Sequence, residues 1–75
     1  MIFESGIQIK IETRRQMRLV LKKIEEETNL IWRTGHLPTK ITINRPNYIF
    51  IHFDYITHGN SQYLDKETIK AEQII

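Results

Sequence analysis

The fold is decided by residues 7–28, which read IQIKIETRRQMRLVLKKIEEET. In the first part, from Ile7 to Glu12, apolar and polar side chains alternate, and this period of two predicts a half-buried β-strand. From about Arg14 to about Thr28 the apolar residues recur at helical spacing, which predicts an amphipathic helix. The buried stripe of that helix is expected to consist of Met17, Val20, Leu21 and Ile24.

Both ends of the predicted helix carry recognisable signals. Thr13 and Gln16 fit the capping-box pattern, with a hydroxyl at the N-cap and an amide three residues later. At the other end, Asn29 suits the left-handed conformation that often ends a helix. Residues 25–27 are all glutamates, which the helix dipole disfavours in the last turns. We interpret them as a solvated acidic end.

The second half of the chain is predicted to supply a meander of short strands. Residues 41–43 alternate, and residues 48–56 form the strongest strand pattern in the sequence. The better core face of that pattern holds Ile49, Ile51, Phe53 and Tyr55. The opposite face holds Tyr48, Phe50, His52 and Asp54. Residues 62–75 stay open between helix and strand, because alternation and helix propensity disagree there.

Together these segments predict an α+β fold, in which one amphipathic helix packs on a small antiparallel sheet of three to five short strands. The helix covers one face of the sheet, and the second face is left open to water or to a partner. The expected core combines the apolar faces of the helix and the strands: Ile9, Val20, Leu21, Ile24, Trp32, Ile51 and Phe53.

Length and composition restrict the function classes. The chain has 75 residues, a formal net charge of +2 and no cysteine. We expect a single domain over residues 1–75, too small to hold a deep substrate cleft. The absence of cysteine excludes disulfides, thiol catalysis and zinc–thiolate sites. No apolar run approaches the roughly 18 residues of a membrane span, and residues 1–4 do not form a signal peptide, so we expect a cytoplasmic protein.

Several short motifs follow one another along the chain in a distinctive order. A strand and a helix lead to a Trp three residues before a Gly, then a Pro-containing loop, an aromatic strand, a Gly turn and an Ile-x-Ala stretch. They are residues 7–11, residues 14–28, Trp32-Arg33-Thr34-Gly35, Leu37-Pro38, residues 48–53, His58-Gly59 and Ile69-Lys70-Ala71. This order resembles a group of very small phage-encoded accessory proteins. The resemblance covers nearly the whole chain and implies a phage or prophage origin, without any shared catalytic chemistry.

No motif in the sequence predicts catalysis, a cofactor or a metal. His52 and Asp54 project from one face of a predicted strand, but even with His36 or His58 nearby nothing else supplies metal-ligand spacing. Ser61, His58 and Asp54 have the side chains of a catalytic triad, yet the chain lacks a nucleophile elbow and a Gly-rich oxyanion loop. We therefore expect a protein that is not an enzyme and has no catalytic, cofactor-binding or metal-binding residues.

Two surfaces are candidate partner-binding sites. Exposed aromatic residues on the second sheet face would form an apolar patch that marks association, and the residues expected there are Tyr48, Phe50 and His52. Basic residues on the helix are typical of contact with a phosphate backbone, and those that line one face at i, i+4 spacing are Arg14, Arg18 and Lys22. We favour the sheet face, because the acidic end of the helix weakens the positive field.

The sequence thus predicts a non-enzymatic phage-type accessory protein that binds a host macromolecule and inhibits or redirects it. A host protein is the favoured target. The most concrete version is an inhibitor of a host defence system, similar to anti-CRISPR proteins. Two alternatives stay open. One is a nucleic-acid-binding accessory factor that uses the basic helix face, and the other is a small-ligand-binding oligomer with pockets at its subunit interfaces. A homodimer formed through the sheet face is also open, and no membrane partner is expected.

Overall fold

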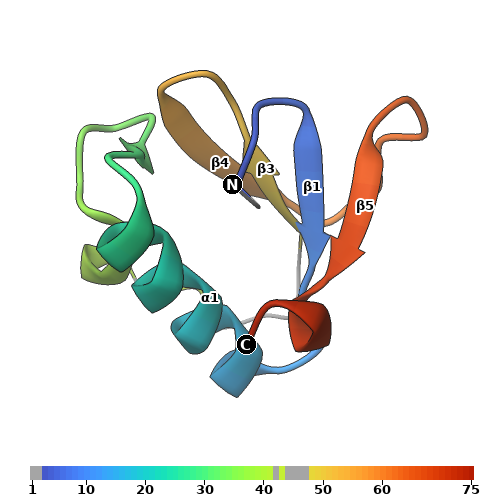
Figure 1. Cartoon of the computed structure of the whole chain (residues 1–75), viewed down its shortest axis with the longest axis horizontal. Coiled ribbons are helices and arrows are strands. Elements are labelled where there is room, and N and C mark those ends of the chain that lie inside the picture. Colours follow the sequence, from blue (N-terminus) through green and yellow to red (C-terminus); the bar gives the residue numbers. More distant parts are fainter. Residues whose placement is uncertain (1–2, 42, 44–47) are drawn as a thin grey trace.

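The computed structural model describes residues 3–41, 43 and 48–75, and within them one α-helix packs on a five-stranded sheet (Figure 1). The α+β class expected from the sequence is confirmed. The helix α1 covers Arg14–Glu27. The strands are β1 (Ile7–Lys10), β2 (Ile31–Trp32), β3 (Tyr48–Ile51), β4 (Tyr55–Gly59) and β5 (Glu67–Lys70). Two short 3₁₀ helices complete the order, η1 (Pro38–Lys40) after β2 and η2 (Ala71–Gln73) after β5.

The start of α1 follows the sequence signal closely. The Thr13 hydroxyl accepts a hydrogen bond from the backbone N–H of Gln16 at 3.1 Å, which satisfies one of the free donors of the first turn. The Gln16 side chain accepts in return from the backbone N–H of Glu12 at 2.7 Å. A capping box would place that return bond on Thr13, so the helix uses the motif shifted by one residue.

The end of α1 differs from the expectation. Thr28 leaves the helix in an extended conformation, and no non-glycine residue of the described chain has a positive φ. The prediction that Asn29 adopts a left-handed conformation is therefore wrong. The physical reason is the Thr28 hydroxyl, which donates to the carbonyl of Ile24 at 2.7 Å and accepts from the N–H of Leu30 at 3.0 Å. These bonds turn the chain directly toward β2 without a left-handed residue.

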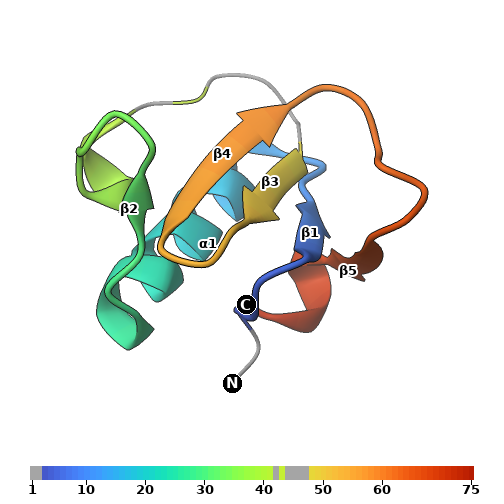
Figure 2. The ribbon, with the colours of Figure 1, turned by 90° about the horizontal axis from the view of Figure 1, so that it is seen from above.

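The sheet has the strand order β2-β4-β3-β1-β5. The three central strands, β4, β3 and β1, pair with one another in antiparallel fashion, but the edge strands pair differently. β2 runs parallel to β4, and β5 runs parallel to β1. The sheet is therefore mixed, and the expected antiparallel pairing holds only for its centre. Each parallel edge needs a connection that crosses the sheet: α1 crosses one face between β1 and β2, and residues 60–66 link β4 to β5 (Figure 2).

The main core lies between α1 and the face of the sheet that holds the odd residues of β1 and β3. Ile9 and Ile49 are opposite each other in the β1–β3 ladder, and both are fully buried. The helix contributes the stripe expected from its periodicity. Buried residues of this cluster include Phe3, Ile7, Ile9, Ile11, Met17, Val20, Leu21, Ile24, Trp32, Ile49, Ile51, Ile56, Ala71 and Ile74.

One expected core residue, Phe53, is not in the core. The segment predicted as a single strand over residues 48–56 is a hairpin, because β3 ends at Ile51 and β4 begins at Tyr55. His52, Phe53 and Asp54 form the turn between them, and the backbone N–H of His52 donates to the carbonyl of Tyr55 at 2.9 Å. Phe53 is consequently 90% exposed at the tip of the hairpin. The remaining six residues of the expected core are buried.

The second face of the sheet is not open as expected, because residues 60–66 fold back across part of it. Gln8 points to this face and is fully buried. Its amide binds the backbone of Tyr63 on both sides, accepting from the N–H at 3.0 Å and donating to the carbonyl at 2.6 Å. The same Gln8 nitrogen also donates to the Thr68 hydroxyl on β5 at 2.9 Å. Gln8 therefore connects the crossing segment to β1 and β5.

The C-terminal residues, left open between helix and strand, divide between the two. Residues 67–70 are strand β5, and η2 follows directly. Residues 62–64 are a loop, neither helix nor strand. Of residues 41–43, expected as a strand, Ile41 and Ile43 lie outside any strand and pack against the core, while residue 42 lies outside the described residues. η2 lies against α1, and its residue Ala71 is buried.

α1 is too short to cross a lipid bilayer, and no helix in the described ranges has both the length and the apolar character that this requires.

Truncation of the core tests the helix register. Leu21→Ala is expected to lower the free energy of unfolding by about 2–5 kcal/mol, because it removes buried methyl groups and leaves a cavity between α1 and the sheet. Urea denaturation followed by circular dichroism measures the change. Leu64→Ala is the matched control, since Leu64 is 94% exposed and its truncation should stay within about 0.5 kcal/mol of the parent. Equal midpoints for the two variants would contradict this packing.

Replacement of the buried amide tests the crossing segment. Gln8→Leu is expected to destabilise the chain by about 1–3 kcal/mol, because the Tyr63 N–H and carbonyl lose their partner. Hydrogen exchange at the Tyr63 amide should also accelerate. Asn60→Leu, which places the same side chain at an exposed position of the segment, is the control. If the Tyr63 amide exchanges at the parental rate in Gln8→Leu, the buried amide does not hold the segment.

Candidate functional site

The six residues proposed as partner contacts lie on two opposite layers of the molecule. Arg14, Arg18 and Lys22 are exposed on α1. Tyr48, Phe50 and His52 belong to β3 and the turn after it, on the sheet face turned away from α1. The structure therefore does not bring the two groups together, and they define two separate surfaces.

Phe50 is the most buried of the six, at 5% exposure. The Tyr63 ring meets it edge-on with centroids 4.8 Å apart, and the Tyr48 ring stacks beside it at 6.3 Å. On β4, Gly59 leaves the space that the Phe50 ring occupies, since a Cβ there would lie 2.8 Å from a ring carbon. Phe50 is thus the centre of a second, small apolar cluster beneath residues 60–66, the crossing segment. The exposure expected for this residue is not observed.

The aromatic surface that does reach solvent is formed by the residues above Phe50. Tyr63 is 53% exposed, and the Lys66 ammonium lies 5.9 Å from its ring centroid. Tyr48 is half-buried, and its hydroxyl donates to the Gln62 side chain at 3.5 Å. The sequence placed Tyr48 correctly on this face. It did not identify Tyr63, because a residue in a loop has no periodicity that assigns it to a face.

His52 is half-buried in a polar–aromatic contact at the hairpin turn. Its ring stacks on Tyr55 with centroids 4.4 Å apart, and Nε2 lies 2.9 Å from the Thr57 hydroxyl. Burial lowers the pKa of His52 below its ordinary value, and the positive charges of Lys66 and Arg33 lower this pKa further. The folded chain therefore favours the neutral imidazole.

The basic and acidic parts of α1 are separated along its length. Arg14, Arg18 and Lys22 follow one another on the N-terminal and central turns, while the last turn contains no basic residue. Glu25 is held by Thr39, whose hydroxyl and backbone N–H both donate to one carboxylate oxygen at 2.7 and 3.1 Å. These hydrogen bonds lower the pKa of Glu25.

The other two glutamates of the acidic end differ in their partners. Glu27 pairs with Lys23 at 3.2 Å, an exposed ion pair that contributes little to stability. In the described part of the chain, Glu26 has no hydrogen-bond or ion-pair partner. The negative charge of Glu26 therefore adds to the partial negative charge that the helix dipole produces at the C-terminal end of α1.

Two apolar side chains that the sequence did not single out as contacts are the most exposed large hydrophobic residues described. They are Phe53, at 90% exposure, and Leu64, at 94%. The start of β1 lies beside the end of β3, because the Gly6 N–H donates to the Ile51 carbonyl, and beside the start of β5, because Ile7 is opposite Glu67. Phe53 follows β3 and Leu64 precedes β5, so both lie toward this end of the sheet. The sequence contains one signal for the exposure of Phe53, because the neighbouring Asp54 is a residue type that favours turns. It contains no such signal for Leu64.

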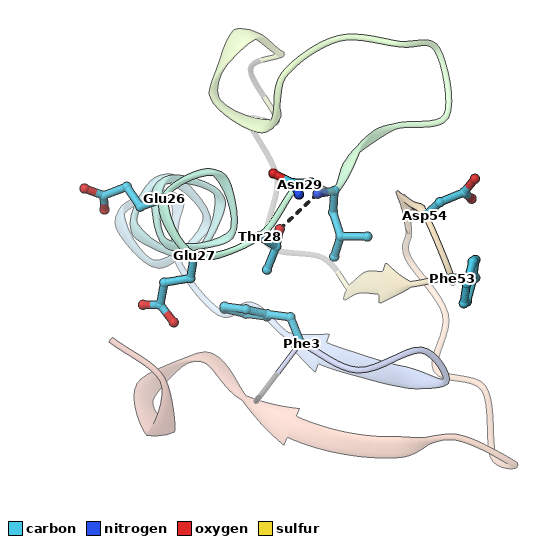
Figure 3. A pocket seen from close by; sticks show the side chains of 8 residues that line it. Phe3, Glu26, Glu27, Thr28, Asn29, Phe53 and Asp54 are labelled. Atoms are coloured by element: carbon cyan, nitrogen blue, oxygen red, sulfur yellow. Dashed lines mark hydrogen bonds between the residues drawn. The ribbon is translucent and has the colours of Figure 1, made fainter.

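A surface hollow of about 490 Å³ lies between the end of α1 and the hairpin turn (Figure 3). Phe3 lies between Glu27 on the helix side and Phe53 on the hairpin side, and Leu30 is a further apolar lining residue. Glu26 and Asp54 stand at opposite rims and extend outward. The hollow is thus lined by apolar side chains together with polar groups, which include carboxylates from both α1 and the hairpin turn.

The described residues do not assemble a catalytic or metal-binding group. No cluster of three or more His, Asp or Glu side chains able to hold a metal ion occurs among them. His58 sits against Trp32, with ring centroids 5.6 Å apart, whereas Asp54 is in the hairpin turn and Ser61 is in the crossing segment. No hydrogen bond within the described ranges joins Ser61, His58 and Asp54.

Comparisons of the chain with protein-family models, with curated proteins and with solved structures find no match. The geometry of the surfaces is thus the basis for any functional conclusion.

The neutral state of His52 predicts a pH dependence of stability. The pKa of His52 is lower in the folded chain than in the unfolded chain, so the contribution of the neutral ring to stability is complete above the unfolded pKa. This contribution is lost as the pH falls through the ordinary histidine range toward the lower folded pKa. His52→Gln should make the melting temperature less dependent on pH over this range. A change of the same size in His36→Gln, which removes an exposed imidazole, would show that the effect does not come from His52.

Proposed function

We propose that this chain is a non-enzymatic, phage-type accessory protein that binds a host protein and inhibits or redirects it, with a host defence system as the most concrete target. The observation that carries the proposal is the exposure of Phe53 and Leu64 at one end of the sheet. Large apolar side chains so fully exposed cost free energy in water, and a partner surface that covers them removes that cost.

Rigid presentation of these side chains supports a binding role. The hairpin turn that carries Phe53 is closed by the His52–Tyr55 backbone bond and by the stacked rings of the same two residues. The segment that carries Leu64 is anchored one residue earlier by Gln8, which binds the Tyr63 backbone. Anchors that are already ordered lose less conformational entropy when a partner binds.

The hollows on the described surface bear on the ligand-binding alternative. Besides the one at the end of α1, a hollow of about 300 Å³ lies beside Arg18 and Leu21, and one of about 260 Å³ lies beside Trp32. A ligand-binding oligomer, the third alternative, would have to complete such hollows with a second subunit, and it would sediment as more than a monomer.

A nucleic-acid interface on α1 is the second candidate, and a specific observation favours it. Arg18 and Lys22 are exposed one turn apart, and Arg15 is exposed on the same helix. Positive side chains on a rigid helix suit a phosphate backbone, and binding of this kind falls steeply with salt concentration. Glu26 at the end of the same helix opposes this role, because it weakens the field along the helix axis.

Two matched double variants separate the candidates. Phe53→Ser with Leu64→Ser is expected to abolish capture of a host protein from nuclease-treated bacterial lysate, while Arg18→Glu with Lys22→Glu should retain it at high salt. Both pairs are exposed, so both variants should melt close to the parent. Cross-linking and mass spectrometry identify the captured protein, and sedimentation gives the oligomeric state. Loss of binding in the charge variant alone, with parental behaviour of the apolar variant, would overturn the proposal in favour of nucleic acid.

A further inference from the structure

We infer that the hollow between the end of α1 and the hairpin turn is a docking groove for a partner segment that carries a cationic side chain next to a large apolar one. The inference rests on the proposed function, since it names the chemistry of the partner protein. It concerns the groove lined by Phe3, Leu30, Phe53, Glu26, Glu27 and Asp54.

The interior of the groove suits one large apolar side chain. Phe3 is buried and forms the floor (Figure 3), and Leu30, in the segment after α1, adds apolar surface to the lining. Phe53 stands on the opposite side with 90% of its surface in water. The hollow, of about 490 Å³, is open to solvent, so a side chain of a partner can enter it from the surface.

The rim of the groove suits positive charge from the partner. Glu26 and Asp54 stand on opposite sides, and neither carboxylate has a hydrogen-bond or ion-pair partner within the described part of the chain. The carbonyl end of α1 adds negative potential at the same place, where Lys23 pairs with Glu27 and leaves Glu26 uncompensated. Carboxylates gathered at the negative end of a helix disfavour the free chain, and a cation from a partner relieves this.

A second copy of the chain is a poorer occupant. A closed dimer through this groove would bring two acidic rims together, because a two-fold interface joins a surface to itself. A contact between the acidic groove of one copy and the basic part of α1 in the next copy would be head-to-tail, and such contacts form rings or filaments. The charge pattern therefore favours a different protein with a basic and apolar segment.

Synthetic peptides test the chemistry directly. The probes are three capped peptides of one length, each with a central Leu-Trp pair flanked by Arg, by Gln or by Glu. Titration into the ¹⁵N-labelled chain should shift the amide signals of residues 26–30 and 53–54, with the Arg peptide bound about threefold to tenfold more tightly than the Gln peptide, and the Glu peptide weakest. The preference for Arg should shrink at high salt.

Matched variants connect the binding to the groove. Phe53→Ala is expected to weaken binding of the Arg and the Gln peptide alike, since it removes apolar contact. Glu26→Gln with Asp54→Asn should remove the preference for Arg and leave Gln-peptide binding as it was. Glu12→Gln with Asp65→Asn removes the same charge from exposed positions outside the groove and is the control. This control should keep the parental preference.

Several results would overturn the inference. They are no shift at millimolar Arg peptide, equal binding of the Arg and Gln peptides, shifts centred outside the groove, an unchanged preference in Glu26→Gln with Asp54→Asn, or occupation of the groove by a second copy in sedimentation. These outcomes are separable from failure of the proposed function. If a host protein is captured through Phe53 and Leu64 but ignores the rim charges, the proposed function stands and the groove chemistry is wrong. If the groove selects the Arg peptide but no host protein is captured, the reverse holds.

Discussion

The fold of this chain depends on the buried amide of Gln8. A strand that runs parallel to its neighbour can join the sheet only after the chain has returned along its length. Residues 60–66 make this return for β5, and Gln8 holds them by pairing with both backbone groups of Tyr63. The Gln8 amide thus satisfies the N–H and the carbonyl of Tyr63, as the backbone of a neighbouring strand would. A buried amide is costly without partners, so it also specifies which segment must cover it.

This constraint gives the two faces of the sheet different characters. The face under α1 is a continuous aliphatic core, with Ile9 and Ile49 at its centre. The opposite face is a polar and aromatic layer, in which Phe50 is enclosed between Gly59 and Tyr63. Because the crossing segment covers the middle of this second face, apolar exposure moves to the turns at the end of the sheet. The proposed binding surface is therefore formed by turns on a rigid support, a common arrangement for recognition.

The charges of α1 add direction to that surface. Basic residues occupy the first turns of α1 and acidic residues occupy the last. At each end the side-chain charge has the same sign as the helix dipole, so it stabilises neither end of the helix. Natural chains depart from such local preferences mainly where function requires it. Here the negative end of α1 adjoins Phe53 and Asp54, and the apolar and electrostatic features meet in one groove. A partner that satisfies both gains affinity from the apolar contact and orientation from the charge.

The sequence by itself determined the helix, its buried stripe, the strand at Ile7–Lys10 and the α+β class, because these follow from periodicity and capping within a few neighbouring residues. It also placed Ile51 and Tyr48 on opposite faces of β3. Only the tertiary structure decided that the run from Tyr48 to Ile56 bends at Phe53, since alternation continues through a tight turn and does not reveal it. The parallel edge strands, the burial of Phe50 and the acid-rimmed groove also needed the folded chain. Each arises from contacts between segments far apart in sequence, such as Gln8 with Tyr63, and local patterns carry no information about such pairs.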